Sequence, residues 1–176
     1  MTDRVIGRDP AVVRRLDVVI QEALDELGLS YERVEEGAFL VKLEGQHKLA
    51  TMTWLVVGDH TLLVEAFFMR KPEENEGGTY KFLLQRNGRA YGVHFSCDVI
   101  GDIYLVGHVS LELVTAEEVD RLLGCVLSYA DDNFDAAIQL GFADSIRREE
   151  AWRAKLAERG EGPPARPIFA PPESAH

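Results

Sequence analysis

Between residues 30 and 70 apolar side chains recur at every second position, and turn residues interrupt the pattern at short intervals. A period of two is typical of β-strands, whose successive side chains point to opposite faces of a sheet. The interruptions, such as Glu36-Gly37 and Gly58-Asp59-His60, are too short to carry a crossover between parallel strands. The segment therefore predicts an antiparallel meander of four strands, over residues 31–35, 38–43, 49–57 and 61–69.

Helical patterns flank this meander. Asp9 and Pro10 are typical of an N-cap and a first helical position, and the apolar residues up to residue 27 predict a one-sided amphipathic helix. A short helix over residues 79–87 and a β-hairpin over residues 91–111 follow. A capping box at residues 115–118 then opens a long helix. The order helix, strands, helix, hairpin, helix predicts an α+β fold, an antiparallel β-sheet with helices packed against it.

Composition divides the chain into four parts. Gly141 is expected to stop or bend the long helix, and five prolines occur in the last seventeen residues. We therefore expect an N-terminal arm, one α+β domain, a C-terminal helix that contains Trp152 and a proline-rich tail, over residues 1–9, 10–141, 142–159 and 160–176.

The charge of the chain limits its partners. Thirty acidic side chains against nineteen basic ones give a net charge of −11. Nucleic acids and anionic membranes are bound by clustered basic residues, so we expect neither as a partner. No apolar run approaches the ~20 residues of a membrane span, and the first residues contain no apolar signal core. With only two cysteines, we expect a cytoplasmic protein with reduced thiols.

Side chains with catalytic or ligating chemistry do not form a recognisable motif. His94 and His108 are expected on one polar face of the hairpin, ~7–8 Å apart as diagonal neighbours, whereas a zinc site needs three or four ligands. Cys97 is expected on the apolar side of its strand, and neither Cys97 nor Cys125 has a base beside it. No serine elbow or phosphate-binding glycine loop occurs. We predict no catalytic, cofactor-binding or metal-ligating residue, no cofactor and no enzymatic activity.

Three carboxylates gather on the second half of the long helix, with no basic residue within four positions. Such a cluster is usually a solvated face, but it could also hold a divalent ion or recognise a basic segment of another protein. The sequence leaves these alternatives open, and it predicts that changing Asp131 alone has little effect. The candidate acidic patch consists of Asp131, Asp132 and Asp135.

Both faces of the two central strands are apolar. A sheet covered on one face alone should alternate more cleanly between apolar and polar residues. The second face is therefore expected to meet a helix or another subunit. A standard protein interface buries ~1,600 Å², much of which residues 61–69 could supply. The candidate interaction surface consists of Trp54, Leu63, Phe67 and Met69.

Three sequence blocks, taken with the order of elements, resemble the YbjN family. They are residues 81–87 (KFLLQRN), 91–98 (YGVHFSCD) and 101–107 (GDIYLVG), followed by the acidic-capped helix from Thr115. The resemblance spans about residues 11–141. The family consists of small bacterial proteins described as sensory transduction regulators, with a fold similar to that of type III secretion chaperones. It implies a homodimer that binds segments of client proteins, and it supplies no catalytic motif.

We therefore expect a non-enzymatic, cytoplasmic protein-interaction or regulatory module that is dimeric and binds a protein segment on an apolar surface. The alternative is a small-molecule or metal-linked sensor or enzyme. That alternative would use His94, His108 and Asp98, or else the carboxylates of the acidic patch.

Overall fold

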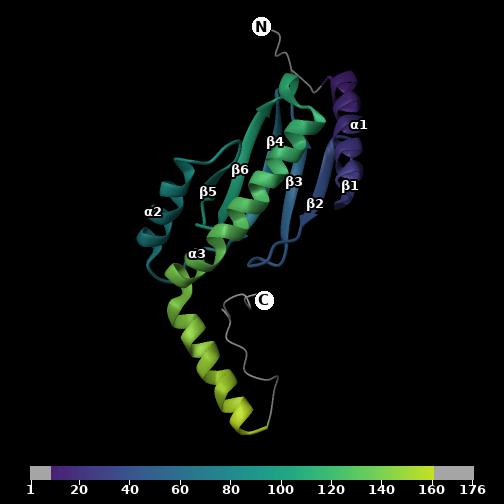
Figure 1. Cartoon of the computed structure of the whole chain (residues 1–176). Helices are drawn as coiled ribbons and strands as arrows, with labels where there is room; N and C mark the ends of the chain where they lie inside the picture. The colour runs from purple at the N-terminus through teal and green to yellow at the C-terminus, as the bar shows by residue number, and fades with distance from the viewer. Residues whose placement is uncertain (1–8, 161–176) are drawn as a thin grey trace, which may run out of the picture.

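In the computed structural model, which describes residues 9–160, the strands form one antiparallel sheet of six. Its strand order is β1-β2-β3-β4-β6-β5 (Figure 1). Consecutive strands pair directly, except that α2 separates β4 from the hairpin of β5 and β6. The strands are β1 (Ser30–Glu35), β2 (Ala38–Leu43), β3 (Thr51–Val57), β4 (Thr61–Met69), β5 (His94–Cys97) and β6 (Ile103–Ser110).

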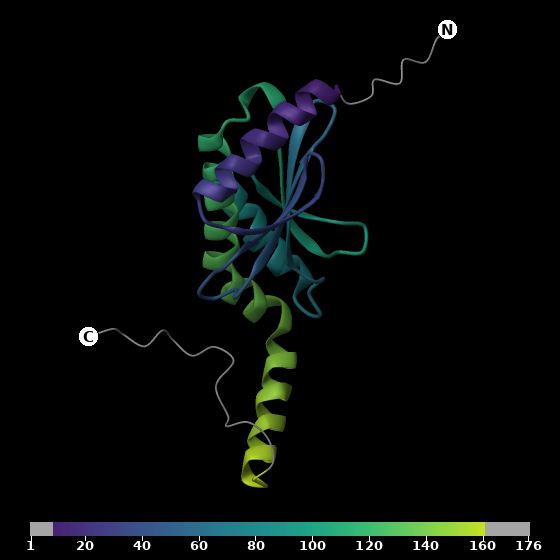
Figure 2. The ribbon, with the colours of Figure 1, turned by 90° about the vertical axis from the view of Figure 1, so that its right-hand side faces the viewer.

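One face of the sheet carries the helices. α1 (Pro10–Glu26) and the first part of α3 (Ala116–Glu158) lie side by side on that face, which Figure 2 shows nearly edge-on. α2 (Glu76–Asn87) packs against α3 and β5 and buries Leu83, and a short 3-10 helix, Leu111–Leu113, precedes α3. The core lies between these layers. Its largest fully buried side chains include Phe39, Phe68, Leu16, Ile20, Leu24, Leu55, Leu62, Leu105 and Leu122.

α3 is broken at Phe142, which has non-helical backbone angles of φ −143° and ψ 23°. The break lies next to Gly141, where the sequence predicts a stop or a bend. Residues 143–158, here called the distal segment, project away from the body of the domain (Figures 1 and 2). None of the helices over residues 9–160 combines the length and apolarity that crossing a bilayer requires.

The predicted α+β class and antiparallel sheet are confirmed, and several boundaries differ. β3 begins at Thr51 rather than at residue 49, and α2 begins at Glu76 rather than at residue 79. β5 is limited to four residues, so residues 91–93 are not strand, and Cys97 is exposed instead of facing the core. The predicted tail and the first eight residues of the predicted arm lie outside the described residues, Gly160 excepted.

Candidate protein-interaction surfaces

The sheet face opposite the helices is apolar and uncovered. Within residues 9–160 no helix lies over it (Figure 2), and Met52 and Phe67 are 42% and 43% exposed. Strand register places its side chains in rows, since Trp54 lies opposite Glu65 and Phe67 lies opposite Tyr104. The rings of Phe67 and Tyr104 meet edge to face at 5.5 Å. We call this surface the open face; its apolar members are Leu40, Met52, Trp54, Val56, Leu63, Phe67, Tyr104 and Val106.

Few charged groups interrupt the open face. Glu65 lies near its centre, Lys42 lies opposite Met52 toward β2, and His94 and His108 lie toward β5. His94 pairs with Val106, two residues before His108, so the two histidines share a face as predicted. Over residues 9–160, no group of three or more His, Cys, Asp or Glu side chains has the arrangement of a metal site.

The structure separates the four residues of the predicted interaction surface. Trp54, Leu63 and Phe67 belong to the open face, but Met69 is 3% exposed and belongs to the core. The prediction for Met69 is wrong because the pairing of β4 with β6 shifts register between Phe67 and Met69. A bulge of this kind breaks the alternation, so Phe68 and Met69 are both buried.

Two of the three carboxylates in the predicted acidic patch bind a loop of the same chain. The loop over residues 44–50, between β2 and β3, crosses α3. There the backbone N–H groups of His47 and Lys48 both donate to Asp131 Oδ1, at 2.8 and 2.9 Å. The His47 ring lies 2.7 Å from Asp135 Oδ2, measured from Nδ1. Asp132 accepts from Ser128 on the same helix. The usual interpretation, a solvated face, is therefore wrong for Asp131 and Asp135, because both bind this loop.

The environment of Asp131 favours its ionised form. Burial tends to raise its pKa, but the backbone N–H groups of Lys48, His47 and Gln46 outweigh burial and lower it. The loop also approaches closely, because a Cβ on Gly45 would lie 2.3 Å from Asp131 Oδ1. No local sequence pattern marks this contact, since more than eighty residues separate the partners.

A groove of about 780 Å³ lies where the loop over residues 44–50, the end of β4 and the break in α3 meet. Its walls are mostly apolar and it is open along one side. We call it the kink groove; the residues that shape it are Lys48, Phe67, Phe68, Phe134, Ile138, Phe142 and Ile146.

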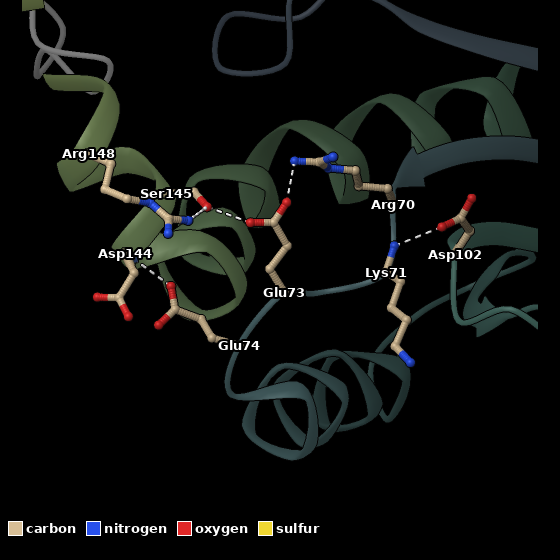
Figure 3. Close-up of polar contacts among 8 residues, drawn as sticks. All are labelled: Arg70, Lys71, Glu73, Glu74, Asp102, Asp144, Ser145 and Arg148. Carbon is tan, nitrogen blue, oxygen red and sulfur yellow. Dashed lines mark hydrogen bonds and ion pairs between the residues drawn. The ribbon is translucent and has the colours of Figure 1, made fainter. Parts of the chain in front are cut away.

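A network of polar contacts holds α3 at its break (Figure 3). The carbonyl oxygen of Gly141 accepts the backbone N–H groups of Glu73 and Glu74, at 3.0 and 3.1 Å. Glu74 Oε1 accepts the N–H of Asp144, and Ser145 Oγ donates to Glu73 Oε2, both at 2.5 Å. The loop after β4, residues 70–75, therefore pairs with the backbone carbonyl and N–H groups of α3 that the break would leave without hydrogen bonds. The sequence analysis found Gly141 but not these partners.

Further charged groups extend this network around the loop after β4. Arg70 donates to the Glu73 carboxylate at 2.7 Å, and its guanidinium lies over the Phe142 ring, 5.1 Å from the centroid. Arg148 donates to Ser145 Oγ, and the backbone N–H of Lys71 donates to Asp102 at 2.8 Å (Figure 3). These contacts fix the direction of the first turns of the distal segment, and with it one wall of the kink groove.

The solved structures that share this fold include two protein complexes. One is the crystal structure of the ExsC–ExsE complex, with a TM-score of 0.51 at 19% identity, covering 73% of this chain and 95% of the other. The second is the HopA1–SchA chaperone–effector complex, with a TM-score of 0.51 at 10% identity, covering 69% and 94%. The type III secretion chaperone-like fold expected from the sequence is thus confirmed.

Sequence comparison finds closer relatives. An uncharacterized protein of Mycobacterium tuberculosis is 48% identical over 145 residues, which are 80% of this chain and 79% of that protein. An uncharacterized protein of Mycobacterium leprae is 43% identical over the same shares. The family profile of YbjN, described as "Putative bacterial sensory transduction regulator", matches residues 17–139. The chain therefore belongs to the YbjN family.

Proposed function

We propose that this protein is a non-enzymatic, cytoplasmic interaction module that acts as a homodimer and binds segments of client proteins in a regulatory or chaperone-like role. The observation that carries the proposal is the open face, with eight apolar side chains that no helix of residues 9–160 covers. Family membership and fold support a protein-binding role.

The character of the open face favours a permanent partner. An exposed apolar patch of this kind promotes aggregation unless another protein covers it. The centres of permanent interfaces are apolar and poor in charge, and among residues 9–160 Glu65 is the only carboxylate near the centre of the open face. A second copy of the chain is present wherever the chain is made. We therefore assign the open face to the homodimer, and client segments to a second apolar surface that meets the open face at Phe67.

Sedimentation equilibrium at micromolar concentration tests the dimer. The wild-type chain should sediment at twice its mass of 19.7 kDa. Met52→Asp and Leu63→Asp, made separately, should shift the mass to that of the monomer, because each places a carboxylate inside the apolar interface. The control is Leu84→Asp on α2, where an exposed apolar side chain lies away from the open face. A monomeric wild type, or a dimer that only Leu84→Asp dissociates, would contradict the assignment.

A further inference from the structure

The kink groove has the form of a site for polypeptide. Its apolar walls come from β4, from α3 before the break and from α3 after it, as Phe68, Phe134 and Ile146 illustrate. Because the groove is open along one side, a small molecule in it would stay largely in contact with water, whereas small-molecule sites bury most of their ligand. A helix or extended segment could lie along the groove and place several apolar side chains in it.

Lys48 is one of five polar or charged side chains that line the kink groove, with His47, Arg70, Ser145 and Glu149, and the Glu149 carboxylate is already paired with Arg153. The Lys48 ammonium donates to the backbone carbonyls of Ala50 and Phe67, at 3.1 and 3.2 Å, and lies 5.9 Å from the centre of the Phe134 ring. An ammonium has three N–H donors, so one remains for a ligand. Burial lowers the pKa of Lys48, because the charged ammonium loses part of its hydration.

The other basic side chains along the groove are already paired. His47 lies against Asp135, and Arg70 donates to Glu73. Lys48 has no carboxylate partner within residues 9–160. A partly buried cation on an apolar surface is best matched by a carboxylate that arrives with apolar neighbours, because a charge-assisted hydrogen bond is strong where water is excluded.

We propose that the kink groove binds a client segment in which an aspartate or glutamate lies among bulky apolar side chains. Its carboxylate pairs with Lys48, and its apolar side chains contact Phe134, Ile138 and Ile146. This inference rests on the proposed function, because it names the chemistry of the segment that such a module binds. It also gives an acidic protein with net charge −11 one defined position at which to accept an acidic partner.

The probe is a displayed library of random sixteen-residue peptides, selected on the full-length chain. Selected peptides should combine Asp or Glu with Phe, Leu, Ile or Trp. In titrations with the synthetic peptide, Lys48→Ala and the peptide's own Glu→Gln change should each weaken binding at least tenfold. The control is Lys81→Ala, which removes an exposed lysine of α2 outside both the groove and the open face and should leave the affinity unchanged. Circular dichroism verifies that each variant is folded.

Several results would overturn the proposal. They include a library that yields no binder, binders that are basic, and binders that tolerate Lys48→Ala. Binding of a synthetic peptide of residues 161–176 that depends on Lys48 would identify the chain's own end as the occupant instead. If Lys48→Ala changed the mass measured by sedimentation, the occupant of the groove would be a second copy of the chain. If the wild-type chain were a monomer and still bound the peptide through Lys48, the dimer would be refuted and this inference would stand. If the chain were a dimer but peptide binding did not depend on the peptide's carboxylate, this inference alone would be refuted.

Discussion

Asp17 shows how a single residue can differ from its helical pattern. The periodicity of α1 places it with Arg14 and Arg15 on the solvent face, yet it is 6% exposed. The hairpin of β1 and β2 folds over it, so that Arg33 donates to both carboxylate oxygens and the backbone N–H of Gly37 donates at 2.7 Å. The partners follow sixteen and twenty residues later, which helical spacing cannot reveal.

The carboxylate of Asp17 should make stability depend on pH. Burial tends to raise its pKa, but hydrogen bonds from Arg33 and Gly37 outweigh burial and lower it. The unfolded chain therefore binds the proton more readily, and the stabilisation is present above about pH 4 and lost as the pH falls through the folded pKa. Asp17→Asn should cost about 1–3 kcal/mol at pH 7. Urea titrations should show the gap from wild type closing toward pH 3; a gap independent of pH would contradict this.

Two buried threonines of β3 predict a stabilising substitution. The hydroxyls of Thr51 and Thr53 have no hydrogen-bond partner within the described part of the chain, although both residues are fully buried. Thr53→Val keeps the shape and removes the unpaired group, so it should raise the free energy of unfolding by about 1 kcal/mol. Thr79→Val is the matched control, because the buried Thr79 hydroxyl donates to Asn75 at 3.1 Å. Thr79→Val should lower the free energy of unfolding. If chemical denaturation showed the same change for Thr53→Val and Thr79→Val, the unpaired hydroxyl would not be the cause.

At the scale of elements, the loop over residues 44–50 depends on α3. The sequence predicts little effect from changing Asp131, but its carboxylate accepts two backbone N–H groups of the loop. Asp131→Ala should therefore lower the free energy of unfolding by about 1–3 kcal/mol. Asp132→Ala removes an exposed carboxylate whose hydrogen bond in the described part of the chain comes from Ser128 of the same helix, and it should change the free energy of unfolding by less than about 0.5 kcal/mol. Hydrogen exchange at the His47 and Lys48 amides should become faster in Asp131→Ala but not in Asp132→Ala. Equal exchange rates in the two variants would show that the Asp131 carboxylate does not hold the loop.

Strands were easier to predict than the contacts between elements. The limits of β2 and β4 agree with those expected, because alternating burial and short turns are visible in the local sequence. The start of α2 was placed too late, since Gly77 and Gly78 indicate a loop whereas the structure includes them in the first helical turn. Met69 was misplaced by a bulge, which leaves no mark in the alternation of β4. Each error arises where tertiary pairing overrides a local pattern.

For the molecule as a whole, one candidate surface was predictable and the other was not. Trp54, Leu63 and Phe67 were found because an apolar second face is visible in the alternation of two strands. The kink groove brings Lys48 next to Phe134 and Ile146, which are far from it in the sequence. Such a site depends on how the loop over residues 44–50 crosses α3 and where α3 breaks. Neither follows from the periodicity of one element.

The break in α3 also predicts where the folded body ends. Phe142 is 5% exposed, and the Gly141 carbonyl accepts two N–H groups from the loop after β4. Beyond Glu149, by contrast, the polar contacts of the described distal segment stay within the helix, as in the pair of Arg153 with Glu149, and Trp152 is 57% exposed. A chain that ends at residue 150 should therefore unfold within about 2 °C of the midpoint of a chain that ends at residue 160.

A chain that ends at residue 140 should be much less stable, because it loses the Phe142 side chain and the Gly141 contacts. Removing a buried phenylalanine typically costs about 3–5 kcal/mol. In a domain of this size that loss lowers the midpoint by at least about 6 °C. Differential scanning calorimetry of the two truncated chains separates the body from the projecting helix. Equal midpoints would mean that the network around Glu73 and Glu74 does not hold the break in solution, and that the kink groove lacks the fixed wall that its ligand requires.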